Sequence, residues 1–228
     1  MSDSKRVVIL GGHGKVALLA APKLASAGAV VESVIRNPDQ SAEVEAARGE
    51  PVVLDIEQAD VEELKRAFDG ARAVVFAAGA GGGNPERTHR VDYEAAVRSM
   101  TAAERAGVHR FLLVSYAGAD VGIEKVDPSS SFYPYAKAKH DADAHLRETG
   151  LDFTILGPGK LTLEPGTGKI RLADLDGTID GRQPRDDEGN TSRDNVAAVI
   201  AHVVTADAAI RRTVTFYDGP TPITEAIR

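Results

Sequence analysis

The fold is decided by Val7-Val8-Ile9-Leu10-Gly11-Gly12-His13-Gly14-Lys15-Val16-Ala17. The first four residues form a continuous apolar run rich in β-branched side chains, which is typical of a strand buried on both faces. The glycines predict a sharp turn. The segment 15–27 is rich in Ala and Leu and is followed by Gly28, so it predicts a helix that ends there.

The alternation of strand and helix continues along the chain. Short apolar runs predict further strands at Val30–Ile35, Pro51–Leu54, Ala73–Phe76, Arg110–Val114 and Phe153–Leu156. Helices are predicted between them at 39–48, 60–68, 86–106 and 134–148. Strict βαβ order implies right-handed crossovers, so we predict an α/β fold: a doubly wound parallel sheet with helices on both faces.

The pattern changes after Gly157. Residues 158–190 are rich in Gly, Asp and Pro and contain one predicted strand, at 169–172. Ser192 is expected to cap a helix through Val204, and 213–216 predicts a last strand. We expect the tail, about 157–228, to be a small C-terminal extension on the substrate side of a single domain that spans 1–228.

Composition excludes several classes of protein. The net charge of -7 and the low aromatic content of 5% argue against a nucleic-acid partner. The chain has no cysteine, which excludes disulfides and thiolate sites. No stretch is long enough to span a membrane, and the first apolar run is too short for a signal peptide. We therefore expect a cytoplasmic protein that does not bind membranes.

The glycine turn fits a dinucleotide-binding fingerprint in a Rossmann-type fold. Gly12, Gly14 and Ala17 match G-x-G-x-x-A, and Gly11, Gly14 and Ala17 match the related G-x-x-G-x-x-A. Gly14 would leave room for the pyrophosphate, Ala17 would keep the helix close to the strand, and Lys15 could add charge. The helix N-terminus supplies free N–H donors for phosphate.

The end of the second predicted strand bears on the choice of cofactor. The fingerprint expects an acidic residue about 20 positions on to hold the ribose 2′-OH. Glu32 satisfies that spacing but lies within the strand, whereas Arg36-Asn37-Pro38 follows its end. Because a guanidinium suits a 2′-phosphate, Arg36 favours NADP, with NAD as the alternative.

A set of motifs recurs along the chain in a fixed order: Gly11–Ala17, Val34–Pro38, Asp55-Ile56, Ala106–Ser115, Ala138-Lys139, Gly157-Pro158-Gly159, Glu164–Gly168 and Ser192–Ala197. Together these motifs resemble those of the atypical short-chain dehydrogenase/reductases that bind NAD(P)H, near the NmrA-like and bacterial sugar-epimerase-like proteins. The resemblance covers nearly the whole chain.

The resemblance implies cofactor contacts at the ends of the predicted strands. The family would place the phosphate turn, including His13 and Val16, against the cofactor. It implies that Asp55 and Ile56 contact the adenine and that Pro158 lies near the nicotinamide. It also implies that Ala77, Ala78 and Gly79 pass under the adenine ribose.

A reductase of this family needs a Tyr that exchanges a proton and a Lys four residues later that tunes it and holds the ribose. Two pairs have this spacing, Tyr133 with Lys137 and Tyr135 with Lys139. Pro134 favours the second pair, because the residue before a proline is pushed out of helical geometry. Ser115 is the candidate third member.

Two residues depart from the family pattern. Active relatives often carry their Ser or Thr one or two residues after position 115, where this chain has Tyr116 and Ala117. Gly157 stands where close relatives commonly carry Arg. Both departures bear on the substrate chemistry more than on cofactor binding.

The leading hypothesis is an NADPH-dependent oxidoreductase that acts on a small carbonyl or enone compound. The alternatives are a non-catalytic NAD(P)H-binding redox sensor and a nucleotide-sugar epimerase. No metal site is expected, because the histidines are dispersed and the acidic run at 186–188 is typical of a solvated loop. A homo-oligomer remains possible in this interpretation.

Overall fold

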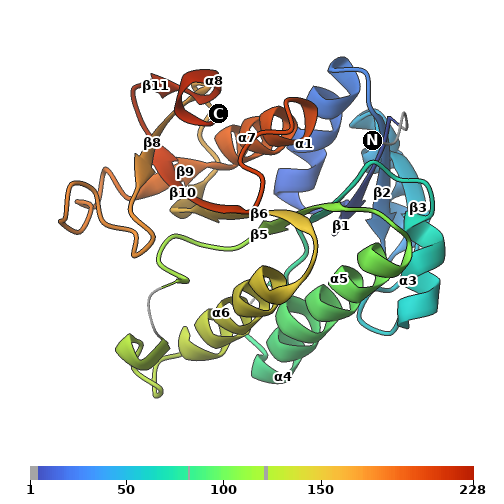
Figure 1. The fold of residues 1–228 in the computed structure, drawn as a ribbon, viewed down its shortest axis with the longest axis horizontal. Helices are drawn as coiled ribbons and strands as arrows, with labels where there is room; N and C mark the ends of the chain where they lie inside the picture. The colour runs from blue at the N-terminus through green and yellow to red at the C-terminus, as the bar shows by residue number, and fades with distance from the viewer. Residues whose placement is uncertain (1–4, 82, 121–122) are drawn as a thin grey trace.

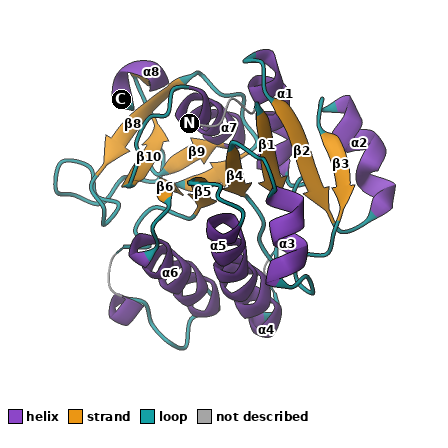
Figure 2. Ribbon diagram, turned by 45° about the vertical axis from the view of Figure 1, so that its right-hand side comes forward, coloured by secondary structure: helices purple, strands orange, loops and turns teal. Residues whose placement is uncertain are grey.

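The computed structural model describes residues 5–81, 83–120 and 123–228. Within these residues a nine-stranded sheet has the order β11-β8-β10-β6-β5-β4-β1-β2-β3 (Figures 1 and 2). Its strands are β1 (Arg6–Leu10), β2 (Val30–Ile35), β3 (Glu50–Val53), β4 (Ala73–Phe76), β5 (Arg110–Val114), β6 (Asp152–Pro158), β8 (Lys169–Ala173), β10 (Arg212–Asp218) and β11 (Thr221–Pro222).

The seven strands from β3 to β10 in this order are parallel to one another, which confirms the predicted doubly wound sheet. β8 is antiparallel to β10 and β11, so the tail adds a reversed strand to the same sheet. The chain moves outward from β1 through β2 to β3 and then returns to β4 on the other side of β1. A crevice is expected at such a switch point, beyond the carboxyl ends of the strands.

Helices cover both faces of the sheet, as Figure 1 shows. On one face α1 and α7 pack against each other and against alternate residues of the strands, including Val7 and Ile9. On the other face α3, α5 and α6 cover the intervening residues of the strands, including Val8 and Leu10. The helices are α1 (Lys15–Ser26), α2 (Ser41–Ala46), α3 (Val61–Phe68), α4 (Pro85–Thr88), α5 (Ala96–Arg105), α6 (Tyr133–Glu148), α7 (Arg193–Thr205) and α8 (Ile223–Ala226).

Three local features differ from the sequence predictions. The helix expected at 86–106 is interrupted by a π-helical segment, His89–Ala95, between α4 and α5. α6 begins at Tyr133 and not at Pro134, because Phe132 is already helical at the cap. A separate two-stranded parallel sheet pairs β7 (Lys160–Thr162) with β9 (Asn190–Ser192), and it was not predicted because both strands are very short.

In the part of the chain that the structure describes, no helix combines the length and the apolar character needed to cross a membrane.

Candidate functional site

The glycine turn between β1 and α1 is packed so closely that side chains are excluded from it. Gly11 has a φ of +80°, and a Cβ added there would lie 2.7 Å from the Ala78 Cα. A Cβ on Gly12 would lie 2.6 Å from the Ser33 Cβ, and one on Gly14 would lie 3.0 Å from the Gly11 carbonyl oxygen. The turn is thus a cradle formed by the backbone, which fits the close approach of a pyrophosphate.

The N-terminus of α1 is open to an anion. Gly14 is the N-cap residue and offers no side chain to the first N–H groups, and the first turn carries no acidic residue. Unsatisfied N–H groups and the helix dipole both favour a bound phosphate here. Lys15 is exposed beside the turn, while Val16 is buried in the core and supports the turn from below.

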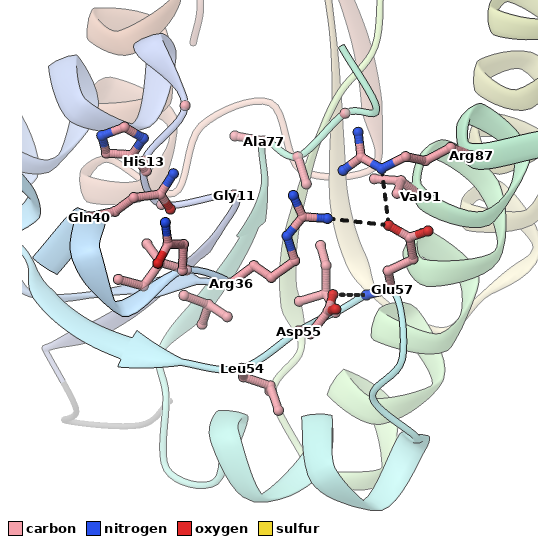
Figure 3. A pocket seen from close by; sticks show the side chains of 18 residues that line it. Gly11, His13, Arg36, Gln40, Leu54, Asp55, Glu57, Ala77, Arg87 and Val91 are labelled. Carbon is pink, nitrogen blue, oxygen red and sulfur yellow. Dashed lines mark hydrogen bonds and ion pairs between the residues drawn. The ribbon is translucent and has the colours of Figure 1, made fainter. Parts of the chain in front are cut away.

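A cavity of about 330 Å³ opens beside this turn, at the carboxyl ends of β1, β2, β3 and β4 (Figure 3). The cavity brings together ten of the residues expected to bind the cofactor: Gly11, Gly12, His13, Gly14, Arg36, Asp55, Ile56, Ala77, Ala78 and Gly79. Lys15 and Val16 do not line it, and Ser115, Lys139 and Pro158 lie elsewhere.

Charged side chains converge at one end of this first cavity. Glu57, which is 9% exposed, pairs with Arg87 at 3.1 Å, Arg90 at 2.9 Å and Arg36 at 3.7 Å. Figure 3 shows Arg36 reaching Glu57 from the left and Arg87 lying above it. Burial alone would raise the pKa of Glu57, but the hydrogen bonds from Arg90 and Arg87 outweigh burial and lower it. The end of the cavity therefore carries an excess of positive charge.

Glu32, the residue at the spacing of an NAD-type acidic ligand, has a structural role. Its carboxylate accepts two hydrogen bonds from the Arg6 guanidinium, at 2.5 and 2.7 Å. It does not line the first cavity. Arg36 is 59% exposed at the cavity, where its guanidinium can reach a bound phosphate.

A second cavity, of about 400 Å³, lies at the carboxyl ends of β5 and β6. It brings together three residues from the predicted site, Ser115, Tyr135 and Pro158. The other residues that line it are Tyr116, Ala117, Phe132, Gly159, Lys160, Leu161, Pro184, Gly189 and Tyr217. Apart from Ser115, Lys160 and the tyrosine hydroxyls, these side chains are apolar.

Lys139 lies beneath Tyr135 and lines neither cavity. Its ammonium, 5.9 Å from the centroid of the Tyr135 ring, pairs with Asp92 at 3.2 Å and donates to the Val114 carbonyl at 3.0 Å. Burial would lower the pKa of Lys139, but Asp92, Tyr135 and Asp143 together outweigh burial and the pKa is raised. Lys139 therefore stays charged while buried.

The pKa of Tyr135 is raised, although Lys139 acts to lower it. Burial is the main cause, and the carboxylates of Asp92 and Asp143 add to it. The charge of Lys139 acts to lower this pKa, as a tuning lysine would, but burial has the larger effect. Tyr135 is consequently a phenol that keeps its proton at neutral pH.

The Ser115 hydroxyl donates to Asp143 at 2.7 Å. Asp143 is 1% exposed, and burial raises its pKa to about 7, while the bond from Ser115 and the charge of Lys139 act in the opposite direction. Tyr116, which follows Ser115, has a pKa raised to about 12 by burial and by Tyr135 and Asp143. Ser115 is thus directed toward a buried carboxyl.

The alternative pair, Tyr133 and Lys137, is placed differently. Tyr133 does not line the second cavity, and Lys137 pairs with Asp141 at 2.7 Å on the exposed side of α6. Tyr135 is the tyrosine of the two that faces the second cavity. Among the residues that the structure describes, no cluster of His, Asp and Glu could hold a metal ion.

Several site residues were missed from the sequence. In the first cavity these are Glu57, which directly follows the Asp55-Ile56 pair, and Arg87, which follows the loop after β4. Their closeness in sequence to predicted cofactor contacts could have identified them. In the second cavity, Lys160 directly follows the Gly157-Pro158-Gly159 motif, whereas Pro184 and Tyr217 lie in the tail and follow no motif.

Comparisons with known proteins agree with this geometry. Residues 11–207 match the model of the NAD(P)H-binding family. The UPF0659 protein C216.03 of Schizosaccharomyces pombe is 33% identical, over 96% of this chain and 92% of its own. The uncharacterized sugar epimerase YhfK of Bacillus subtilis is 34% identical, over 87% of this chain and 86% of its own.

Solved structures show the same fold. The oxidoreductase ylbE from Lactococcus lactis is 28% identical, with a TM-score of 0.81 over 97% of this chain and 94% of its own. The residues matched by the family model begin at the glycine turn, directly after β1, and include Tyr135 of α6. The chain belongs to the NAD(P)H-binding family, in agreement with its resemblance to the atypical short-chain dehydrogenase/reductases.

Proposed function

We propose that this protein is an NADPH-dependent reductase of small carbonyl compounds. The observation that carries the proposal is the arrangement of the two cavities. One lies beside the phosphate cradle, and the other, which holds the Tyr135 phenol, opens along the same edge of the sheet. A dinucleotide that extends across the ends of parallel strands would place its two halves in this order.

The residues of the first cavity suit the adenosine and phosphate groups. The glycine turn and the N-terminus of α1 would hold the pyrophosphate. Asp55 and Ile56 would contact the adenine, and Ala77 to Gly79 would pass beneath its ribose. Arg36 supports NADP over NAD, because its exposed guanidinium can pair with a 2′-phosphate.

In the second cavity the chain would supply a proton and exclude water. Bound NADPH supplies the hydride. Tyr135, which keeps its proton because of its raised pKa, donates it to the substrate oxygen as negative charge develops there. Lys139 steadies the resulting phenolate from below, since its own charge is held by Asp92. Pro158 would lie beside the nicotinamide.

One observation favours a second candidate, a non-catalytic sensor of NADP(H) or NAD(H). The Ser115 hydroxyl is directed toward Asp143, and the next position holds Tyr116. The hydroxyl that would help Tyr135 to polarise a carbonyl is therefore committed elsewhere. A sensor would bind the cofactor through the same glycine cradle and reduce nothing.

The test combines binding with turnover. NADPH and NADH would be titrated by their fluorescence, and NADPH oxidation followed with a panel of aldehydes, quinones and enones. We expect turnover that falls at least tenfold in Tyr135→Phe and is retained in the matched control Tyr133→Phe on the same helix. Tight NADPH binding with no turnover on any compound would favour the sensor.

A further inference from the structure

Three aromatic rings form one wall of the second cavity. Tyr116 and Phe132 meet edge to face with centroids 5.4 Å apart, and Tyr135 lies 5.6 Å from Tyr116 and 5.5 Å from Phe132. Phe132 is 44% exposed at this wall, so part of its ring is free to contact a ligand. Such rings favour a flat aromatic partner, which can stack on them or meet them edge to face.

A second part of the cavity wall, formed by Tyr217, Gly159 and Pro158, is held rigidly. Tyr217 donates from its hydroxyl to the Gly177 carbonyl at 2.7 Å, which fixes the ring. Gly159 packs against the face of this ring, in a position that leaves no room for a side chain. With Pro158 next to it, the wall is smooth and preformed, so binding a flat ligand requires little reorganisation.

The charge of the second cavity differs from that of the first. Lys160 is an exposed residue that lines this cavity, and none of the ion pairs among the described residues involves its ammonium. No acidic side chain is found among the described residues that line this cavity, whereas Asp55 and Glu57 line the first. A ligand with a negatively charged group would therefore be favoured over a neutral one.

We propose that the substrate of this cavity is a small aromatic carbonyl compound that carries an acidic group. The inference rests on the proposed reductase function and adds the class of its substrate. The rings of Tyr116, Phe132 and Tyr135 contact the aromatic part, and Lys160 pairs with the acid. The cavity, about 400 Å³, must also admit the nicotinamide, which limits the substrate to a few rings at most.

The same features disfavour a nucleotide sugar. A sugar diphosphate needs several cations or N–H donors around its two phosphates. Lys160 alone, in an aromatic cavity, does not provide them.

Binding of two matched probes tests the inference without turnover. The chain has five Tyr and no Trp, and three of the tyrosines line this cavity, so quenching of tyrosine fluorescence reports its occupancy. We would titrate 4-carboxybenzaldehyde and its methyl ester into the protein, with and without NADP⁺. We expect the acid to bind about fivefold more tightly, by a difference that shrinks with added salt.

Two variants locate the effect. Lys160→Met should abolish the preference for the acid, whereas the control Lys169→Met, at another exposed lysine, should keep it. Phe132→Leu should weaken both probes about fivefold. Equal binding of acid and ester, or a preference that survives Lys160→Met, would overturn the inference.

The outcomes also separate this inference from the proposed function. Selective binding of the acid with no reduction of any carbonyl compound would support the ligand class inferred for the cavity and refute the reductase. Reduction of aliphatic neutral aldehydes at rates equal to those of the aromatic acid would support the reductase and refute the substrate class.

Discussion

The two cavities at the edge of the sheet are built in opposite ways. The first is shaped by backbone, where glycines hold neighbouring segments in contact, and its end carries three arginines around one carboxylate. The second is shaped by aromatic side chains over a buried group of charges, Asp92, Lys139 and Asp143. A turn shaped by its backbone fits one ligand group closely and tolerates no added side chain. The side chains that form the wall of the second cavity can be substituted without disturbing the fold. On the proposed function, specificity for the cofactor and for the substrate would therefore reside in separable parts of the molecule.

The largest expected effect comes from breaking the buried pair beneath the second cavity. Lys139→Met leaves the Asp92 carboxylate buried without its cation, which should cost about 3–5 kcal/mol of unfolding free energy. The double variant Asp92→Asn, Lys139→Met should recover part of this loss. Urea unfolding measures both. A single variant as stable as the parent protein would show that the pair does not support the second cavity.

The backbone cradle can be tested by adding one methyl group. Gly11→Ala places a Cβ against the Ala78 backbone at a φ of +80°, and we expect a loss of about 2–3 kcal/mol and at least tenfold weaker NADPH binding. Gly28→Ala is the matched control, because its φ is +91° but the space around it is open. It should cost about 1 kcal/mol and leave NADPH binding unchanged. Equal effects would mean that close packing is not what shapes the turn.

The pH dependence of stability tests the burial under the second cavity. The pKa of Asp143 is raised from its ordinary value of 3.8 to about 7, so the folded state holds the proton more tightly than the unfolded state. Its contribution to stability is fully present below pH 3.8 and is lost as the pH rises through about 7. The groups that face it are Ser115, Tyr116, Tyr135 and Lys139.

Asp143→Asn removes this titration. Relative to the variant, the parent protein should lose roughly 2 kcal/mol of unfolding free energy between pH 4 and pH 8, because the folded protein holds the Asp143 proton more tightly than the unfolded chain. Thermal unfolding of both proteins across this range measures the difference. A difference that stays constant with pH would show that folding does not raise the pKa of Asp143.

The smallest expected effect concerns the charged end of the first cavity. Arg36→Ala should weaken NADPH binding about fivefold while NADH binding changes little, since an exposed guanidinium contributes about 1 kcal/mol to a phosphate contact. Arg90→Ala is the control, because Arg90 also pairs with Glu57 but does not line the cavity. Equal weakening of NADPH and NADH by Arg36→Ala would remove the case for NADP preference.

The contrast between the cavities also explains what the sequence could predict. The first cavity could be predicted because β1, the glycine turn and α1 are consecutive in the sequence. The carboxyl ends of parallel strands also meet at one edge of the sheet, so the residues that follow each strand could be expected there. The second depends on side chains such as Tyr116 and Tyr217, which lie about a hundred residues apart and meet only through the order of the strands. The π-helical segment left no sequence signal, because its composition is that of an ordinary helix.

That π-helical segment has a consequence for how the protein could be recombined with its relatives. Asp92, carried by the segment, accepts the Ala80 N–H at 2.9 Å, beside the first cavity, and pairs with Lys139 under the second. A chimera that took the cofactor-binding half from one parent and the substrate-binding half from another would have to inherit both partners from the same source. Because Asp92 links the two halves, the boundary of such a chimera cannot separate Asp92 from Lys139, even though different side chains line the two cavities.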